Sequence, residues 1–267
     1  MGGIRENSQS SQYQTGSGRV AAQDIEKIEV HWSSGSVHVQ EGDAQDITFE
    51  ETYMSTAAGL SAKDEMHYRV KDKKLTIYFR APTRAGVELN KDLNLSIPKD
   101  MALKELSVNT ASAEMIIEHI RSDAFSLNSA SGAICLSAIS GKELEISTAS
   151  GAVQAAQLRF EEVEANGVSG AIVLSGDIQE TDCASISGAI EIMPGENAKK
   201  VEAESVSGEI SIRMPEHKGF RAEYASVSGL FSCAFEARVS KNQAIYGDES
   251  TAMELQTVSG AIQILKQ

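Results

Sequence analysis

GVSGAIVL at residues 167–174 is followed by SISGAIEI at 185–192 and SVSGEISI at 205–212. Further copies, aligned on the glycine of the Ser-Gly step, are SASGAICL (129–136), TASGAVQA (148–155), SVSGLFSC (226–233) and TVSGAIQI (257–264). The key position recurs at spacings of 19, 19, 19, 18, 20 and 21 residues, and then of 31, at Ala113, Gly132, Gly151, Gly170, Gly188, Gly208, Gly229 and Gly260. A self-similar unit of about 19 residues therefore decides the fold.

The alternation inside each unit predicts β-strands. After the glycine, apolar residues share its parity, as Ile210 and Ile212 do with Gly208, which is the period of a strand with one buried face. Before it the parity switches, because the apolar residues lie seven and five positions upstream, as in Leu144 and Ile146 before Gly151. The odd step predicts a corner at the small or polar pair between the two sets, such as Ser147-Thr148 or Glu204-Ser205. The residue two before each glycine is then expected to point inward: Ala130, Val168, Ile186 and Val206.

Each unit thus contains a strand, a corner, a second strand and a looser third side marked by Ile120, Ile139, Leu158 and Ile178. Stacked units about 4.8 Å apart would pair strands between neighbours, as in a parallel β-helix. We predict an all-β, single-chain, parallel β-helix-like solenoid with rungs of about 19 residues. The inward glycine is expected to make room for a bulky side chain from the opposite wall, or to permit a bend. A β-propeller is the alternative, but its blades take about 40 residues each.

The N-terminal part of the chain is less regular. Residues 1–23 are rich in Ser, Gln and Gly and lack the apolar centre of a signal peptide, which predicts a flexible leader. Residues 24–108 are expected to form a wider capping section, with strands at 25–39, 47–54, 66–80 and 93–101, a hairpin turn at KDKK (71–74), and loops at 55–65 and 81–92. Residues 109–267 form the regular solenoid.

The sequence also makes two predictions about the C-terminal end of the solenoid. The insertion between Gly229 and Gly260 is expected to shield this end of the stack. Ile262–Ile264, as the last strand in the chain, is expected to be an exposed edge that could pair with another chain.

Charge and composition limit the function. A net charge of −14 disfavours nucleic acid and anionic lipid as partners. No apolar run is long enough to span a membrane. The odd cysteine count and the absence of Cys/His spacing argue against a disulfide framework or a zinc site. No cofactor or metal is expected.

The recurring hydroxyl residues are the candidate binding site. Serine or threonine stands three and one positions before most of the glycines, and stacked rungs would align these residues as two outward columns. The ligand-surface candidates are Thr148, Ser150, Ser185, Ser187, Ser205, Ser207, Ser226 and Ser228. The alternative is structural: small hydroxylated side chains satisfy the backbone of a tight corner.

Other reactive side chains form no catalytic pattern. His31 and His38 flank the first Ser-Gly step and are more typical of exposed strand histidines than of metal ligands. Cys183 and Cys233 fall on inward positions, while Cys135 falls on an outward one. A polysaccharide-cleaving enzyme would need acids and bases that converge on one face. The acidic residues at 161–164 and at Asp177 and Asp182 are more typical of a solvated acidic edge.

The chain resembles a known family in three stretches: the S-G-A/E-I repeats, IEVHWSSGSVHVQEG (28–42) and LNLSIPKDMALKELSVNTASAEM (93–115). They are similar to the bacterial putative-adhesin family of β-strand-repeat proteins, the domain of unknown function 4097, over about residues 24–267. The resemblance implies a β-helix-like domain that is often carried at the cell envelope behind an N-terminal membrane segment or signal. It brings no established catalytic residues.

From these observations we expect a non-enzymatic, envelope-associated binding or scaffold module, adhesin-like, with a cell-surface glycan or protein as its partner. The alternatives are a polysaccharide-active β-helix enzyme and an intracellular assembly or regulatory module. The location is expected to be the cell envelope or the exterior if an N-terminal segment has been trimmed, and the cytoplasm otherwise.

Overall fold

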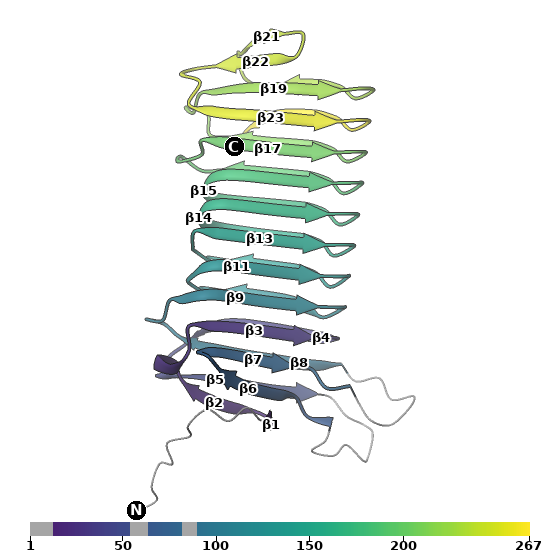
Figure 1. Cartoon of the computed structure of the whole chain (residues 1–267). Coiled ribbons are helices and arrows are strands. Elements are labelled where there is room, and N and C mark those ends of the chain that lie inside the picture. Colours follow the sequence, from purple (N-terminus) through teal and green to yellow (C-terminus); the bar gives the residue numbers. More distant parts are fainter. Residues whose placement is uncertain (1–12, 54–63, 82–89) are drawn as a thin grey trace, which may run out of the picture.

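Stacked parallel strands build a tall column in the computed structural model, which describes residues 13–53, 64–81 and 90–267 (Figure 1). The predicted all-β solenoid is confirmed, since each repeat forms one rung and pairs with the rungs above and below it. Parallel pairing between rungs rules out the propeller, whose blades are built from four-stranded sheets around a channel.

One wall of the column, here called wall A, consists of the strand that precedes each corner glycine. Equivalent residues of neighbouring repeats pair directly, as Leu144 does with Val163 and Val163 with Thr181. In spatial order wall A contains β3 (Lys27–Trp32), β9 (Leu103–Thr110), β11 (Ser122–Ser129), β13 (Glu143–Thr148), the second half of β14 (Val153–Gly167), the second half of β15 (Ile172–Ser185), β17 (Lys200–Ser205), β23 (Thr251–Thr257) and β19 (Phe220–Ser226).

The second wall, wall B, consists of the shorter strand that follows each glycine. It contains β4 (Gly35–Gly42), β10 (Glu114–Glu118), β12 (Ile134–Ser137), the first halves of β14 and β15, β16 (Ile190–Pro194), β18 (Ile210–Met214), β24 (Ile262–Lys266) and β20 (Phe231–Cys233). Inward Ile, Val and Leu side chains of both walls fill the core, together with Ile120, Ile139, Leu158 and Ile178 from the third side. Those four apolar points were predicted correctly.

The corner lies two residues later than the sequence analysis places it. Wall A strands continue inward through the residue three before the glycine, so Ser185 and Ser205 are buried. The chain bends over the next residues, and Val206 and Ile186, expected inside, are exposed. The predicted odd step in parity exists, but its predicted position is wrong, because the hydroxyl residues end the strand and the bend follows them.

The corner glycines are required by a close approach of main chain to main chain. A Cβ on Gly188 would overlap the carbonyl group of Gly170, and a Cβ on Gly208 would overlap that of Gly188. The same relation connects every stacked glycine from Gly132 onward. The glycine therefore makes room for the backbone of the adjacent rung, and the expected bulky side chain from the opposite wall is not what it accommodates.

An antiparallel cap closes the N-terminal end. β7 (Lys74–Tyr78) and β8 (Lys91–Pro98) extend walls A and B beyond β3 and β4. The predicted KDKK turn is confirmed, because Asp72 and Lys73, both with positive φ, join β7 to β6 (His67–Lys71). β5 (Asp46–Tyr53) lies antiparallel to β8, and β2 (Gly18–Ala21) to β5.

The first residues of the described chain belong to this cap. β1 (Gln14–Thr15) pairs with β6, and a short 3-10 helix spans Ala22–Asp24. The part of the predicted leader from Gln14 onward is therefore structured. The predicted loops at 55–65 and 81–92 lie mostly outside the described residues, and Lys91 and Asp92 belong to β8.

A buried ion pair organises the inside of the cap. Lys91 Nζ lies 2.8 Å from Glu51 Oε1, and the two side chains are 1% and 3% exposed. Lys91 also donates to the carbonyl of Asp64, and the Met66 amide donates to Glu51 Oε2. Both charges are thus partnered, as buried charges must be.

The last rung in the chain is not the last rung in space. In Figure 1 the yellow β23 lies between the green β17 and β19, and the pairings agree: β23 joins both, and β24 lies between β18 and β20. The expectation that Ile262–Ile264 forms an exposed edge is therefore wrong, because β24 is paired on both sides.

The insertion before β23 covers the outermost rung. β22 (Gln243–Tyr246) pairs antiparallel with β19, and β21 (Arg238–Ser240) pairs with β22. Phe220, Phe235 and Tyr246 pack together beneath it, with ring centroids 4.8–5.7 Å apart. The predicted shielding of this end is confirmed.

We expect Gly188→Ala to lower the free energy of unfolding by about 1–3 kcal/mol, because the new methyl group overlaps a main-chain carbonyl that cannot move alone. Urea unfolding followed by circular dichroism measures this. Gly167→Ala is the matched control, since its Cβ would meet only the flexible end of Ile172 at 3.2 Å. Equal losses in the two variants would contradict the close-approach explanation.

Candidate binding face

The outer face of wall A and its corner carry four parallel columns of side chains. Because the rungs stack in register, each repeat position forms a line along the column, and alternate residues of each strand face solvent. Counted from the corner glycine, the outward positions are six and four before it, and the corner itself exposes the residues two and one before it.

The inner hydroxyl column is buried, which corrects part of the candidate ligand surface. Thr148, Ser185 and Ser205 are 5–6% exposed, and Ser226 is half-buried. Each hydroxyl accepts the amide of the glycine three residues later: Gly188 N–H reaches Ser185 Oγ at 2.9 Å, and Gly208 N–H reaches Ser205 Oγ at 2.7 Å. The same bond joins Gly151 to Thr148 and Gly229 to Ser226. These residues are unavailable to a ligand because they satisfy the backbone of the corner.

The outer hydroxyl column is exposed at Ser150, Ser187, Ser207 and Ser228. It also bridges rungs: Ser187 Oγ donates to the Val168 carbonyl at 3.1 Å, and Ser228 Oγ donates to the Val258 carbonyl at 3.3 Å. The structure therefore separates the eight candidate residues into a buried set and an exposed set on opposite sides of the chain.

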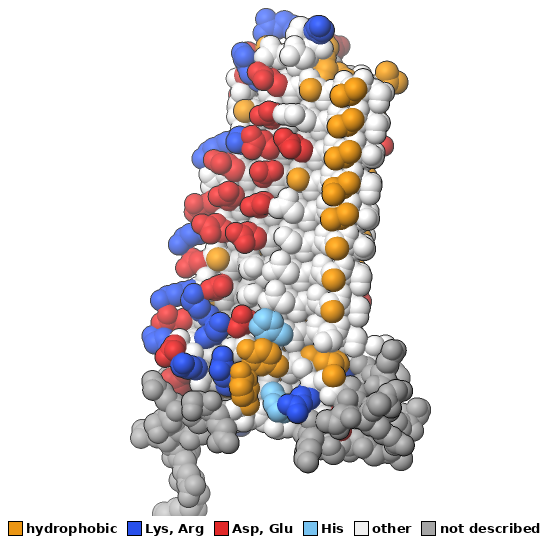
Figure 2. Space-filling view, turned by 45° about the vertical axis from the view of Figure 1, so that its right-hand side comes forward, with side chains coloured by type: hydrophobic (Ala, Val, Ile, Leu, Met, Phe, Trp, Pro, Cys, Tyr) orange, Lys and Arg blue, Asp and Glu red, His pale blue; other side chains and the backbone are white. Residues whose placement is uncertain are grey.

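A line of exposed apolar side chains runs along the corner beside the outer serines. This corner ridge consists of Val168, Ile186, Val206, Val258 and Val227, which are 43%, 53%, 48%, 49% and 82% exposed, and it is the orange column of Figure 2. Ala111, Ala130 and Ala149 continue it toward the N-terminal cap with smaller side chains. The sequence analysis placed these positions inside. The signal in the sequence is the Ser or Thr that directly precedes the ridge residue in four of these five rungs, at Ser185 and Ser205 among others. A solvent-facing position does not require a hydroxyl in rung after rung. The repetition therefore indicates a buried hydroxyl with a fixed hydrogen-bond partner, followed by a residue that faces solvent.

A carboxylate ladder lies on wall A four residues before the ridge position in each rung. Its members face one another across paired strands, Glu164 beside Asp182, Asp182 beside Glu202, and Glu202 beside Glu254. Glu145 and Glu223 extend it at the two ends. It lies within the red area of Figure 2, to the left of the orange ridge.

The carboxylates of the ladder outnumber the cations that pair with them, so the ladder carries a net negative charge. Partial burial raises the pKa of Asp182, and the charges of Glu202, Glu164 and Glu204 add to this rise, while Lys200 lowers the pKa. Lys200 Nζ lies 2.8 Å from Glu202, and the amides of Asn166 and Gln256 donate to Glu164 and Glu254 at 2.7 Å. Like charges directly opposite each other on neighbouring strands are unfavourable.

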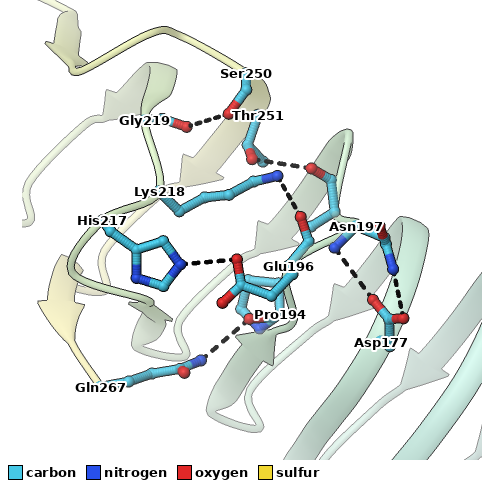
Figure 3. Close-up of polar contacts among 11 residues, drawn as sticks. Asp177, Pro194, Glu196, Asn197, His217, Lys218, Gly219, Ser250, Thr251 and Gln267 are labelled. Carbon is cyan, nitrogen blue, oxygen red and sulfur yellow. Dashed lines mark hydrogen bonds and ion pairs between the residues drawn. The ribbon is translucent and has the colours of Figure 1, made fainter.

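The third side of the column holds a network of polar contacts that ties successive turns together (Figure 3). Asn197 donates to Asp177 through its backbone and side-chain nitrogens at 3.1 and 2.6 Å, and His217 Nε2 lies 2.9 Å from Glu196. Thr251 Oγ1 donates to the Ala198 carbonyl at 3.0 Å, and Gln267 to that of Pro194 at 3.1 Å. Asp177 is therefore engaged in the turn that follows β16, on a different side of the column from Asp182.

The histidines and cysteines have structural surroundings. His31 stacks on Tyr78 with ring centroids 5.0 Å apart, whereas His38 lies on wall B, 3.3 Å from Glu118. Cys183 is buried, and Cys233 is half-buried. Burial and the charge of Glu114 raise the pKa of Cys135, which does not favour a reactive thiolate.

Within 13–53, 64–81 and 90–267, the structure brings no three His, Cys, Asp or Glu side chains together as a metal site. The same ranges contain no helix with the length and apolar character to cross a membrane.

Comparisons with known proteins identify the fold. Residues 23–265 match the family model described as Toastrack DUF4097. A putative lipid binding protein from Parabacteroides distasonis has a similar structure, with a TM-score of 0.56 and 18% identity over 95% of this chain and 97% of that one. Putative adhesins from Parabacteroides distasonis and Parabacteroides merdae have TM-scores of 0.51 and 0.50, with 15% and 13% identity, over 95% and 96% of this chain and 97% of each neighbour. No curated protein matches the chain.

We expect Ser205→Ala to reduce the free energy of unfolding by about 1–3 kcal/mol, because the Gly208 amide loses its acceptor while buried. Ser207→Ala, two residues later, is expected to change it by less than about 0.5 kcal/mol, since that side chain is exposed. Chemical denaturation of the two variants measures the difference, and equal effects would mean that the inner hydroxyl has no special role.

We expect Asp182→Asn to stabilise the chain by about 0.2–1 kcal/mol at neutral pH, because it removes a like charge between Glu164 and Glu202. A carboxyl whose pKa is raised by folding destabilises the native state above that pKa, and the penalty is relieved as pH falls through it. The gain should therefore shrink in acid and in high salt. Thermal unfolding across pH and salt measures this, and a gain independent of both would contradict an electrostatic origin.

Proposed function

Because the chain belongs to the Toastrack DUF4097 family, we propose that it is a non-enzymatic binding or scaffold module of the cell envelope, adhesin-like in its mode of action. The observation that carries this proposal is the corner ridge. Five neighbouring rungs hold β-branched side chains in contact with water, although the strands of these rungs bury most of their Ile, Val and Leu residues in the core. Contiguous exposed apolar side chains of this kind mark interaction sites.

The scaffold suits such a role. Each rung is bonded to the next through both walls and through the corner, so the ridge is held straight by rigid elements. The solved structures with this fold include two described as putative adhesins, which supports an adhesive role without identifying a ligand. The partner we propose is a cell-surface protein or glycan. The outer hydroxyls of Ser150, Ser187, Ser207 and Ser228 are the proposed polar contacts beside the ridge.

The proposal is tested by binding of the fluorescently labelled chain to isolated envelope fractions and to a glycan array. We expect saturable binding to at least one of them, and a loss of about tenfold or more in affinity for Val206→Asp/Val258→Asp. Ser187→Tyr/Ser207→Tyr tests the hydroxyl contacts. Val239→Asp, an exposed valine on β21, is the matched control. No binding by a folded chain, or binding that every variant retains, would overturn the proposal.

A further inference from the structure

The corner ridge borders a groove that runs along the column. On wall A, the outward residues between ridge and carboxylate ladder are small or amide-bearing for the most part: Asn166, Ala184, Glu204, Gln256 and Ala225. The floor of the groove is formed by the chain at Ser185, Ser205 and Thr257. One side of the groove is therefore the apolar ridge, and the carboxylate ladder lies two residues beyond the small and amide-bearing residues of the opposite side.

The dimensions of this groove follow from strand geometry. The carboxylate and the ridge residue of a rung are four residues apart along the chain, and the strand ends one residue before the ridge position, so at 3.3 Å per residue they are at most about 13 Å apart. The ridge from Val168 to Val227 crosses five rungs spaced by about 4.8 Å, which makes it about 19 Å long. A width of this order fits an α-helix, whose diameter with side chains is about 10–12 Å. The helical pitch of about 5.4 Å is also close to the rung spacing.

Charge selects among the possible occupants. Each of the five rungs places one carboxylate on the same flank, Glu164, Asp182, Glu202, Glu254 and Glu223, and within these rungs Lys200 is the cation seen to pair with a ladder member. A second copy of the chain would bring two such ladders toward each other, and the net charge of −14 opposes this. The same charge disfavours an anionic membrane. A positively charged partner would relieve the repulsion within the ladder.

We propose that the groove binds a cationic amphipathic helix of a partner protein, with the apolar stripe of the helix on the corner ridge and its Lys or Arg residues on the carboxylate ladder. This inference rests on the proposed binding function and names the class of partner. A helix of about 13 residues would cover the five rungs from Val168 to Val227. The mode is helix-in-groove recognition, in which residues at i, i+3, i+4 and i+7 act as anchors.

The test uses the whole chain and a labelled helical peptide of about 14 residues, with Leu along one stripe and Lys along one flank. We expect saturable binding by fluorescence anisotropy, weakened about tenfold or more by Val206→Asp/Val258→Asp. Glu202→Lys/Glu254→Lys should weaken it by a similar factor, and binding should fall as salt rises because the charged contacts are exposed. Val206→Ser/Val258→Ser is a second ridge variant that adds no charge.

Matched controls separate this mode from non-specific attraction. Asp100→Lys/Glu236→Lys changes the net charge by the same amount at exposed sites away from the groove, and Val239→Asp adds a charge at an exposed valine on β21. These variants should bind within about twofold of the parent chain, and a scrambled Lys/Leu peptide or one with Glu in place of Lys should bind at least tenfold more weakly.

Several outcomes would overturn the inference. The first is the absence of saturable peptide binding. The second is equal binding of the scrambled peptide, and the third is an equal loss of affinity in the groove and control variants. Ridge-dependent dimerisation in sedimentation experiments, or ridge-dependent binding to phosphatidylglycerol vesicles without peptide binding, would assign the ridge to a different occupant. Envelope binding without peptide binding would overturn this inference and leave the proposed function standing. Peptide binding without envelope binding would overturn the proposed function and leave the binding of a cationic helix standing.

Discussion

At the corners from Gly132 onward, a glycine lies against a main-chain carbonyl group of the neighbouring rung, and no side chain fits between them. This contact brings the main chains of successive rungs together at the point where they bend. The Ser or Thr three residues earlier completes it, because its hydroxyl accepts the glycine amide that the bend leaves without a strand partner. The rung at Ala113 turns at the same spacing without a glycine, so the close approach restricts the rungs from Gly132 onward, where a glycine occupies every corner.

In-register stacking converts every position of the repeat into a column. Inside the molecule this gives continuous apolar lines from the Ile, Val and Leu residues of both walls. Outside, it multiplies whatever residue type the repeat carries, so one carboxylate per rung becomes a ladder and one valine per rung becomes a ridge. The ladder is unfavourable for folding, and the ridge is unfavourable in water. Both effects are relieved by a partner with the opposite charge and an apolar stripe, which is why the two columns are considered as one surface.

The ends of the column are built differently from its middle. At the N-terminal end, antiparallel strands and the buried Lys91–Glu51 pair replace the repeat, and at the other end the β21–β22 hairpin pairs with β19. The return of β23 and β24 into the gap beside β17 and β18 leaves the chain terminus paired on both sides. Edge pairing of the last strand with another chain is thus removed as a mode of association.

The sequence by itself determined the repeat, its length, the strands and most of the core, because alternation within a strand is a local property that Leu144, Ile146, Ile210 and Ile212 display directly. The KDKK turn was predictable for the same reason. Only the tertiary structure decided the location of the corner, since Ser205 is buried by a bond to Gly208 and Val206 is exposed by the bend between them. It also decided the order of the rungs. Near-identical repeats can pair with one another almost equally well, so the repeat itself does not determine their order. The place of β23 between β17 and β19 depends instead on the insertion that covers β19.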